Sequence, residues 1–265
     1  FTMDAAADPY SYKEPLYRTG VAVGDYPVDH HHFRHPDWKS LPDLEFYPVP
    51  SFNVPLGSMI PKGVDDLIVA EKSISVSNLM NGATRLQPVV MQLGQAAGAL
   101  AALACIEDRN VRKIGIRQVQ DELLEAGCYI MPYLDLPKDD QHFKVLQRIG
   151  ATGILRGEGR NVGWSNETWF RADDPLKGEE LHVAEFYGAI VIEPGEISVG
   201  RMLDLVRIYG GKIPSVSEEE WWNMLGLSDF DRSRTATRLE AAVVIDAAFD
   251  PFRMFDVDYK GRFRM

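Results

Sequence analysis

The chain has 265 residues, of which 45% are hydrophobic and 25% charged, a composition typical of a globular protein with one or two domains. Its net charge of −11 argues against nucleic acid as a partner, because binding to phosphate backbones requires basic stripes. The same charge disfavours an anionic membrane surface. The two cysteines, Cys105 and Cys128, belong to no metal motif and do not decide the compartment. A periplasmic or extracellular location would need a targeting segment upstream of Phe1.

Short apolar runs in the first part of the chain predict β-strands. They are Val21–Gly24, Phe46–Val49, Phe52–Leu56 and Leu67–Ala70. The prolines in the second and third runs suggest edge positions or bends. The fourth run is compact and bounded by charged pairs, so we expect a strand buried on both faces.

Three consecutive histidines follow the first of these strands. On an extended chain, His30 and His32 point to one face, whereas Asp29 and His31 point to the other. Histidine titrates near neutral pH, so His30 and His32 are the candidate acid–base residues of the chain. A surface strand or a structural histidine is the alternative interpretation. A metal site is disfavoured, because no further ligands with metal spacing are visible.

The longest apolar stretch runs from residue 81 to residue 106 and predicts a long helix that follows a turn at Asn81-Gly82. Pro88 suits the first helical turn, where its missing N–H costs nothing. The N-terminus of such a helix favours an anionic group. A buried core helix is the alternative interpretation. We reject a membrane span, because Gln92 and Gln95 lie inside the stretch and no anchor residues flank it.

Beyond this helix, the composition changes at Pro137–Asp140, which predicts a domain boundary. An amphipathic helix is predicted before it, at Ile116–Ala126. After it come short helices and loops with a weak internal echo. Thr237 and Glu240 have the spacing of a capping box at the start of a final helix. The tail after that helix is predicted to lie on the surface.

Several common catalytic motifs are absent from the sequence. Gly157, Gly159 and Gly163 miss the dinucleotide-binding fingerprint by one residue, and neither a strand nor an apolar helix flanks them. The sequence also lacks a G-x-S-x-G nucleophile elbow and an H-E-x-x-H motif. The chain therefore carries no phosphate-binding Rossmann turn of its own.

Two segments nevertheless carry a specific resemblance. Ile60–Ala70 (IPKGVDDLIVA) and Arg85–Leu103 (RLQPVVMQLGQAAGALAAL) resemble the C-terminal end of FAD-dependent oxidoreductases of the glutathione-reductase-like superfamily. The bacterial branch that includes xanthan lyase-annotated members is the most similar, and Val23–His30 (VGDYPVDH) resembles a further stretch of it. The resemblance covers roughly residues 16 to 130.

The resemblance implies that the start of the long helix faces the pyrimidine side of a flavin and stabilises its negative charge when reduced. The residues that would line this cofactor site are Ala70, Glu71, Asn81, Gly82, Arg85, Leu86 and Gln87. Arg85 has an alternative interpretation as an ordinary surface arginine. The family has a glycine followed by a basic residue after the apolar strand, whereas this chain has Glu71-Lys72.

The second part of the chain resembles S-layer homology repeats. The matching pieces are Phe143–Gly157, Trp169–Leu176 and Thr237–Glu240. Such repeats can bind cell-wall polysaccharide, but a helical domain that only packs is the alternative. The first repeat departs from the pattern at residues 177–180. Exposed tryptophans would favour a sugar or protein surface, and buried ones would favour the packing role.

We therefore predict an α+β fold with two parts. Residues 1–136 form the strand-rich, flavin-completing part of an FAD-dependent oxidoreductase, and residues 137–265 form a mainly helical domain similar to S-layer homology repeats. The complete enzyme would transfer hydride to flavin. The Rossmann half of the same protein is the expected partner, and without it this chain would be inactive and bind FAD weakly or not at all. A glycan-binding module and a non-catalytic interaction domain are the alternatives.

Overall fold

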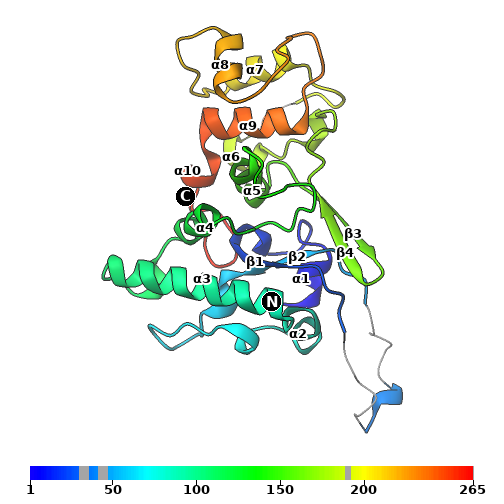
Figure 1. Ribbon diagram of the computed structural model, residues 1–265, viewed down its shortest axis with the longest axis vertical. Helices are drawn as coiled ribbons and strands as arrows, with labels where there is room; N and C mark the ends of the chain where they lie inside the picture. Colours follow the sequence, from blue (N-terminus) through cyan, green and yellow to red (C-terminus); the bar gives the residue numbers. More distant parts are fainter. Residues whose placement is uncertain (30–35, 41–46, 189–191, 265) are drawn as a thin grey trace. The chain divides into compact units, whose positions relative to one another are not determined.

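The computed structural model describes residues 1–29, 36–40, 47–188 and 192–264. Contacts divide the chain into two compact units (Figure 1). Unit 1 comprises Phe1–Leu134, Glu158–Trp169 and Asp256–Met265, and unit 2 comprises Asp135–Gly157 and Phe170–Phe255. The functions assigned above to residues 1–136 and 137–265 stay predictions.

The two units differ in their secondary structure. Unit 1 contains α1 (Met3–Ala7), β1 (Gly20–Gly24), β2 (Phe52–Pro55), α2 (Asn78–Thr84), α3 (Gln87–Ile106), α4 (Ile116–Glu125), β3 (Glu158–Val162) and β4 (Ser165–Trp169). Unit 2 contains α5 (Phe143–Thr152), α6 (Ala184–Tyr187), α7 (Val199–Ile208), α8 (Glu218–Met224), α9 (Arg238–Phe249) and α10 (Pro251–Met254). With 43% helix and 12% strand, the structure confirms the α+β class. The first part is not strand-rich, however, because the described residues up to 136 form a single two-stranded sheet, β1–β2.

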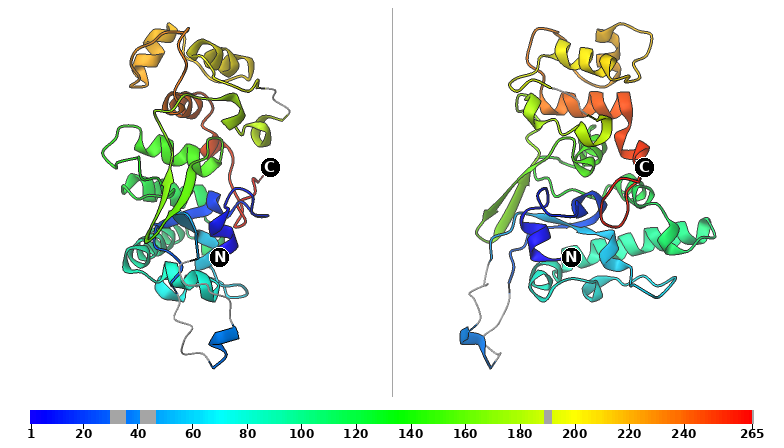
Figure 2. Two further views of the ribbon diagram at one scale, coloured as in Figure 1. Left: turned by 90° about the vertical axis from the view of Figure 1, so that its right-hand side faces the viewer. Right: turned by 180° about the vertical axis from the view of Figure 1, so that it is seen from behind.

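The core of unit 1 forms where α3 packs on the antiparallel pair β1–β2, as both views of Figure 2 show. One face of α3 buries Val89, Leu93 and Leu100. A Cβ atom at Gly24 would lie 2.9 Å from the Val89 side chain, so glycine permits the close approach of strand and helix. Gly24 of β1 therefore sets how closely the strand and the helix pack.

The predicted strand Leu67–Ala70 is absent. Leu67 is 44% exposed, and residues 68–70 are half-buried rather than buried. The segment makes two backbone hydrogen bonds: Val69 N–H donates to the Met59 carbonyl at 2.8 Å, and the Ala70 carbonyl accepts from Ser73 N–H at 3.4 Å. A strand buried on both faces needs hydrogen-bonded neighbours on a sheet, and the described residues supply none at this position.

The turn predicted at Asn81-Gly82 is also wrong. Both residues lie inside α2, whose first turn is capped by the Ser77 hydroxyl, which accepts a hydrogen bond from Met80 N–H at 3.2 Å. The chain instead breaks between Arg85, which ends α2, and Leu86, which precedes α3. Two helices separated by this break replace the glycine turn.

Two segments from the later part of the sequence belong to unit 1. In the β3–β4 hairpin, the Thr168 carbonyl accepts from Leu134 N–H at 2.9 Å, and the Thr168 hydroxyl accepts from Ser51 at 2.7 Å. In the tail, the Gly261 carbonyl accepts from the Arg18 guanidinium at 3.4 Å. The tail buries Val257, so the prediction that it lies on the surface is wrong.

Unit 2 is organised around three related segments that hydrogen-bond to one another in a ring. Leu176 N–H donates to the Ala236 carbonyl at 2.8 Å, Ala236 N–H to the Ile197 carbonyl at 2.9 Å, and Ile197 N–H to the Leu176 carbonyl at 3.0 Å. A second round of hydrogen bonds joins the same three segments in the opposite direction: Gly178 N–H donates to the Gly195 carbonyl, Val199 N–H to the Arg234 carbonyl and Arg238 N–H to the Asp174 carbonyl. The weak internal echo of the sequence is thus a pseudo-threefold arrangement.

Each segment of this ring leads into a helical turn. Ser198 caps α7 and Thr237 caps α9, and Thr237 forms the predicted capping box with Glu240. The third segment leads only to the single turn Gly178–Glu180. The departure from the repeat pattern at residues 177–180 therefore coincides with the shortest of the three helices.

Candidate functional site

The start of α3 and the segments beside it form the first candidate site. Leu86 occupies the N-cap position and its side chain makes no capping hydrogen bond, while Gln87 and Pro88 are exposed. Pro88 has no N–H and Val90 N–H donates to the Leu86 carbonyl, so the first-turn donors without a partner inside this 20-residue helix are the N–H groups of Gln87 and of the buried Val89. Their partial positive charge favours an anionic group, as the sequence predicts.

Arg85 adds a positive charge beside this helix start. Its guanidinium lies 3.5 Å from the Asp29 carboxylate, and the same carboxylate oxygen accepts a hydrogen bond from the Tyr26 hydroxyl at 3.4 Å. Arg85 is 41% exposed and Asp29 is 13% exposed on their side chains, so the guanidinium reaches solvent while its partner is largely covered. The structure thus joins Arg85 to the segment that follows β1.

Of the other predicted cofactor residues, Ala70 and Glu71 lie at the turn Glu71–Ser73, which packs against α3. Glu71 has a φ of +57°, a left-handed conformation that glycine adopts without strain. Asn81 is half-buried and Gly82 is buried, both within α2. Asn81 and Gly82 thus lie in the helix that directly precedes the start of α3, and the cofactor roles of all four residues stay predictions.

The proposed acid–base residues, His30 and His32, lie outside the described residues. Their neighbour Asp29 is described and contacts Arg85. The catalytic roles of the two histidines therefore stay predictions. Within the described residues, no group of three or more His, Cys, Asp or Glu side chains has the arrangement of a metal site, and no disulfide joins Cys105 to Cys128.

Gln92 has a structural role that the sequence reasoning missed. Its side-chain oxygen accepts from Val23 N–H at 2.9 Å, and its side-chain nitrogen donates to the Val23 carbonyl at 3.0 Å and to the Pro88 carbonyl at 3.1 Å. The amide thereby takes the place of a neighbouring strand along the edge of β1. The sequence shows Gln92 as a polar residue inside an apolar helix. That pattern argued against a membrane span, but it did not identify the strand that the side chain contacts.

A pocket of about 340 Å³ opens beside Gln92. It is lined by Val23, Gly24, Asp25, Ser51, Pro88, Gln92, Tyr129, Pro132, Tyr133 and Leu134. These residues come from the end of β1, from the segment before β2, from the first turns of α3 and from the segment after α4. The sequence places Val23, Gly24 and Asp25 in a strand and in the stretch of family resemblance, but it does not predict a pocket, because the lining residues converge only in the folded chain.

The opposite face of α3 is uncovered in the described part of the chain. Its exposed residues recur at helical spacing: Met91, Gly94, Gln95, Gly98, Ala101, Ala102 and Cys105. Met91 is 75% exposed, and a Cβ atom added at Gly94 or Gly98 would meet nothing within 4 Å. By length and composition α3 could cross a membrane, and one third of its most apolar window is buried. The absence of a membrane span stays a prediction.

In unit 2, the residues that carry the resemblance to S-layer homology repeats are largely buried. The Arg238 guanidinium, 6% exposed, donates to the carbonyls of Phe170 at 3.0 Å and Arg156 at 2.7 Å and pairs with Glu180 at 3.1 Å. Trp221 and Trp222 are buried as well. These side chains therefore hold the ring segments together.

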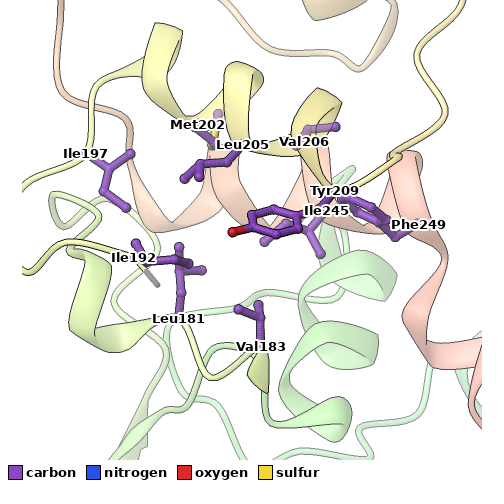
Figure 3. A pocket seen from close by; sticks show the side chains of 10 residues that line it. All are labelled: Leu181, Val183, Ile192, Ile197, Met202, Leu205, Val206, Tyr209, Ile245 and Phe249. Carbon is purple, nitrogen blue, oxygen red and sulfur yellow. The ribbon is translucent and has the colours of Figure 1, made fainter. Parts of the chain in front are cut away.

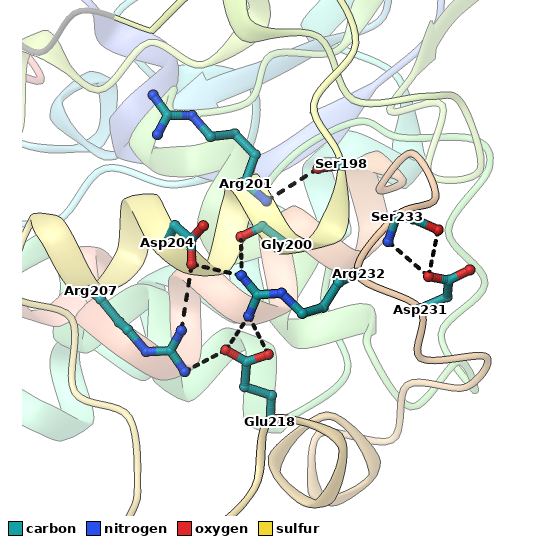
Figure 4. Close-up of polar contacts among 9 residues, drawn as sticks. All are labelled: Ser198, Gly200, Arg201, Asp204, Arg207, Glu218, Asp231, Arg232 and Ser233. Carbon is teal, nitrogen blue, oxygen red and sulfur yellow. Dashed lines mark hydrogen bonds and ion pairs between the residues drawn. The ribbon is translucent and has the colours of Figure 1, made fainter.

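The exposed charges of unit 2 are paired with one another (Figure 4). The Arg232 guanidinium donates to both carboxylate oxygens of Glu218 and lies 2.8 Å from the Asp204 carboxylate. The Arg207 guanidinium also contacts the Glu218 carboxylate. Partial burial alone would raise the pKa of Glu218, but hydrogen bonds from Arg232 and Arg207 hold it below its usual range. Because the two arginines and two carboxylates balance, this cluster offers little net charge to a ligand.

Unit 2 also contains an apolar cavity of about 50 Å³ between α7, α9 and the segments at 181–183 and 192–197 (Figure 3). Ten side chains line it, and the Tyr209 hydroxyl is the main polar group among them. This volume holds no more than a few heavy atoms. The cavity is therefore a packing defect of the core rather than a substrate site.

Comparison with known proteins relates one part of unit 1 to a family. Residues 10–123 match the family model described as FAD dependent oxidoreductase. No curated protein and no solved structure matches the chain. The matched residues include β1, β2, α2, α3 and most of α4, and hence the helix start with Arg85. The match supports a relationship between this portion of the chain and the FAD-dependent oxidoreductases.

Proposed function

We propose that unit 1 supplies the flavin-completing part of an FAD-dependent oxidoreductase and that a dinucleotide-binding Rossmann half completes the enzyme. The observation that carries this proposal is the uncovered face of α3, which lies within the residues that match the family. Small residues at Gly94 and Gly98 with open space around them suit the close approach of another backbone. Leu67, which is 44% exposed, lies in the same matched region.

The donor groups at the start of α3 fit the cofactor that the family implies. A flavin has electronegative pyrimidine oxygens, and the first-turn N–H groups without a partner inside the helix could donate to them. Arg85 would add a positive charge next to these donors, and Asp29 would hold its guanidinium in place. FAD would supply the hydride acceptor of the reaction, and this chain would orient it and stabilise negative charge.

The pairing with a second half also explains why we expect little binding of FAD to this chain alone. The start of α3 offers contacts to one end of the cofactor only. The pyrophosphate normally binds a glycine-rich turn at a helix start, and the sequence 1–265 contains no such fingerprint. Affinity for the whole dinucleotide would therefore depend on the second half.

The proposal is tested by co-expressing the chain with a dinucleotide-binding half of a matching family member and measuring flavin absorbance of the purified complex. Gly98→Leu places a bulky side chain on the uncovered face of α3. It should preserve folding, since nothing lies near the added side chain and leucine favours helices more than glycine. We expect the variant to lose the partner and the flavin absorbance together.

Glu122→Leu, at an exposed position of α4, is the matched control and should retain both. A colourless complex, or a Gly98→Leu variant that still pairs and holds flavin, would contradict the proposal. Once an active complex exists, His30→Ala and His32→Ala test the acid–base assignment, which fails if turnover is unaltered in both variants.

The alternative functions receive less support. The tryptophans that serve as a test of a glycan-binding module are divided: Trp221 and Trp222 are buried, whereas Trp164 is 63% and Trp169 36% exposed on the β3–β4 hairpin. Arg238 binds backbone carbonyls and is not available to a glycan. The ring of three segments fits a repeat architecture without requiring a ligand. A non-catalytic interaction domain would pair with a partner and remain colourless, which is the outcome that the co-expression experiment separates.

A further inference from the structure

We propose that the pocket between the end of β1 and the first turns of α3 binds a compact organic cation, a primary ammonium group on a short apolar or aromatic body. This binding needs no flavin, so its test is independent of the proposed function. The pocket measures about 340 Å³ and lies wholly within unit 1. That volume accommodates a small ligand of about ten to fifteen heavy atoms.

The charge of the pocket comes from a single side chain. Asp25 is the only charged residue in the lining, which includes no Lys, Arg or His. Its side chain is exposed, and within the described residues its carboxylate has no hydrogen-bond or ion-pair partner. An ionised carboxylate without a counter-charge, at the wall of a pocket, attracts a cation.

Two side-chain donors of the lining, those of Gln92 and Ser51, are already engaged. Gln92 uses its side-chain nitrogen on the carbonyls of Val23 and Pro88, and the Ser51 hydroxyl donates to Thr168. Pro88 has no N–H, so the helix start offers no donor at this wall. A ligand that carries negative charge would therefore find no free donor among these groups, whereas a ligand that donates would find Asp25.

The remaining walls suit the apolar body of such a ligand. Pro88, Pro132 and Leu134 present apolar surface, and Leu134 is 50% exposed at the rim. Tyr129 and Tyr133 add aromatic rings, whose faces attract cations. Apolar and aromatic walls with one convergent acceptor are the lining expected for an aromatic or short alkyl amine.

Asp25 is held in position by a segment outside the family match. Its backbone carbonyl accepts from Asn166 N–H of β4 at 3.0 Å, and β4 is tied to Ser51 through Thr168. The β3–β4 hairpin and the segment 129–134 both follow residue 123, where the match ends. The pocket therefore combines Asp25, which lies within the family match, with walls that lie beyond it.

The test compares three probes of nearly equal shape on the full chain without flavin: benzylamine, benzyl alcohol and benzoate. Binding is followed by ligand-observed NMR, with dissociation constants from titration. We expect benzylamine to bind at least about tenfold more tightly than benzyl alcohol, and benzoate not to bind. Asp25→Asn should weaken benzylamine binding by about tenfold or more and remove the preference over the alcohol.

Asp139→Asn, an exposed carboxylate of unit 2, is the matched control and should leave binding unchanged. Leu134→Arg adds a positive charge at the rim without touching Asp25, and should also weaken benzylamine binding. It provides a second route to the answer if Asp25→Asn unfolds. The proposal is overturned if no probe binds at millimolar concentration, if alcohol and amine bind equally, or if neither pocket variant changes binding.

Discussion

The two units of this chain differ in how far their backbone groups and helix faces find partners within the unit. In unit 2, three segments from distant parts of the sequence donate to one another in a ring, so each segment's hydrogen bonds are met inside the unit. In unit 1, α3 buries one face on β1, but its other face and the nearby segment 67–70 remain uncovered in the described residues. Unit 2 therefore satisfies its ring hydrogen bonds internally, whereas the described part of unit 1 has an uncovered helix face on which another element can pack.

The two arginines that the sequence singled out show the same contrast. Arg238 of unit 2 is buried and binds two backbone carbonyls, which is the environment of a structural residue. Arg85 of unit 1 is partly exposed and has a single long ion pair, which leaves donors for a ligand. Burial and the number of engaged donors, rather than the motif, distinguish a residue that holds the fold from one that can bind.

The largest expected effect tests the self-contained character of unit 2. Arg238→Ala removes two hydrogen bonds and the pair with Glu180, so the unfolding free energy of unit 2 should fall by about 3 kcal/mol. Urea unfolding followed by tryptophan fluorescence measures the loss, since Trp221 and Trp222 are buried in this unit. Arg201→Ala is the control: its side chain extends away from the charge cluster in Figure 4 and is exposed, so we expect a change within about 0.5 kcal/mol. Equal effects of the two substitutions would refute the structural role of Arg238.

The next prediction tests how unit 1 protects the edge of β1. Gln92→Ala removes both hydrogen bonds to Val23 and should lower the unfolding free energy of unit 1 by about 1.5 kcal/mol. Gln95→Ala lies one turn along on the uncovered face of α3 and should cost almost nothing. The two substitutions thus compare the stability contributed by the packed face of α3 with that contributed by its uncovered face. Hydrogen exchange of the Val23 amide provides a local readout, which should speed up in the first variant only.

These contrasts indicate how far the sequence could predict the structure. The long helix with Pro88 in its first turn, the strand at Val21–Gly24 and the capping box of Thr237 follow from local rules, and the structure contains all three. The strand at Leu67–Ala70 failed because a strand depends on neighbours that an apolar run does not identify.

The candidate sites were less accessible to sequence reasoning. The helix start with Arg85 was found through the family resemblance, whereas the pocket at Asp25 draws on residues up to about 110 positions apart in the sequence, from Val23 to Leu134. Likewise, the ring of unit 2 joins Leu176, Ile197 and Ala236, whose dissimilar side chains hide the repeated backbone pattern. Long-range convergence of this kind leaves no local signal.

A smaller effect concerns the uncovered region of unit 1. Glu71 has a φ of +57°, where a side chain is strained, at the position where the family has glycine. Glu71→Gly should therefore raise the unfolding free energy by about 0.5 kcal/mol, the relief of strain being partly offset by the flexibility of glycine in the unfolded chain. Asp66 has a similar φ of +53°, but its carboxylate accepts from Val111 N–H at 3.2 Å. Asp66→Gly should therefore not stabilise, and thermal unfolding of both variants separates backbone strain from the hydrogen bond.

The smallest effect returns to the closed unit and depends on pH. Arg232 and Arg207 lower the pKa of Glu218 in the folded state, against the opposing effect of partial burial. A carboxylate with a lowered folded pKa contributes stability above its unfolded pKa of about 4.3, and this contribution is lost as the pH falls through the folded value. Glu218→Gln should thus cost on the order of 0.5 kcal/mol at pH 7 and nothing once Glu218 is protonated. Glu219→Gln shares the first turn of α8, and hence the helix dipole, without these arginine contacts. A pH-dependent difference between the two variants in urea unfolding would isolate the ion pairs, and its absence would show that the cluster in Figure 4 adds no stability.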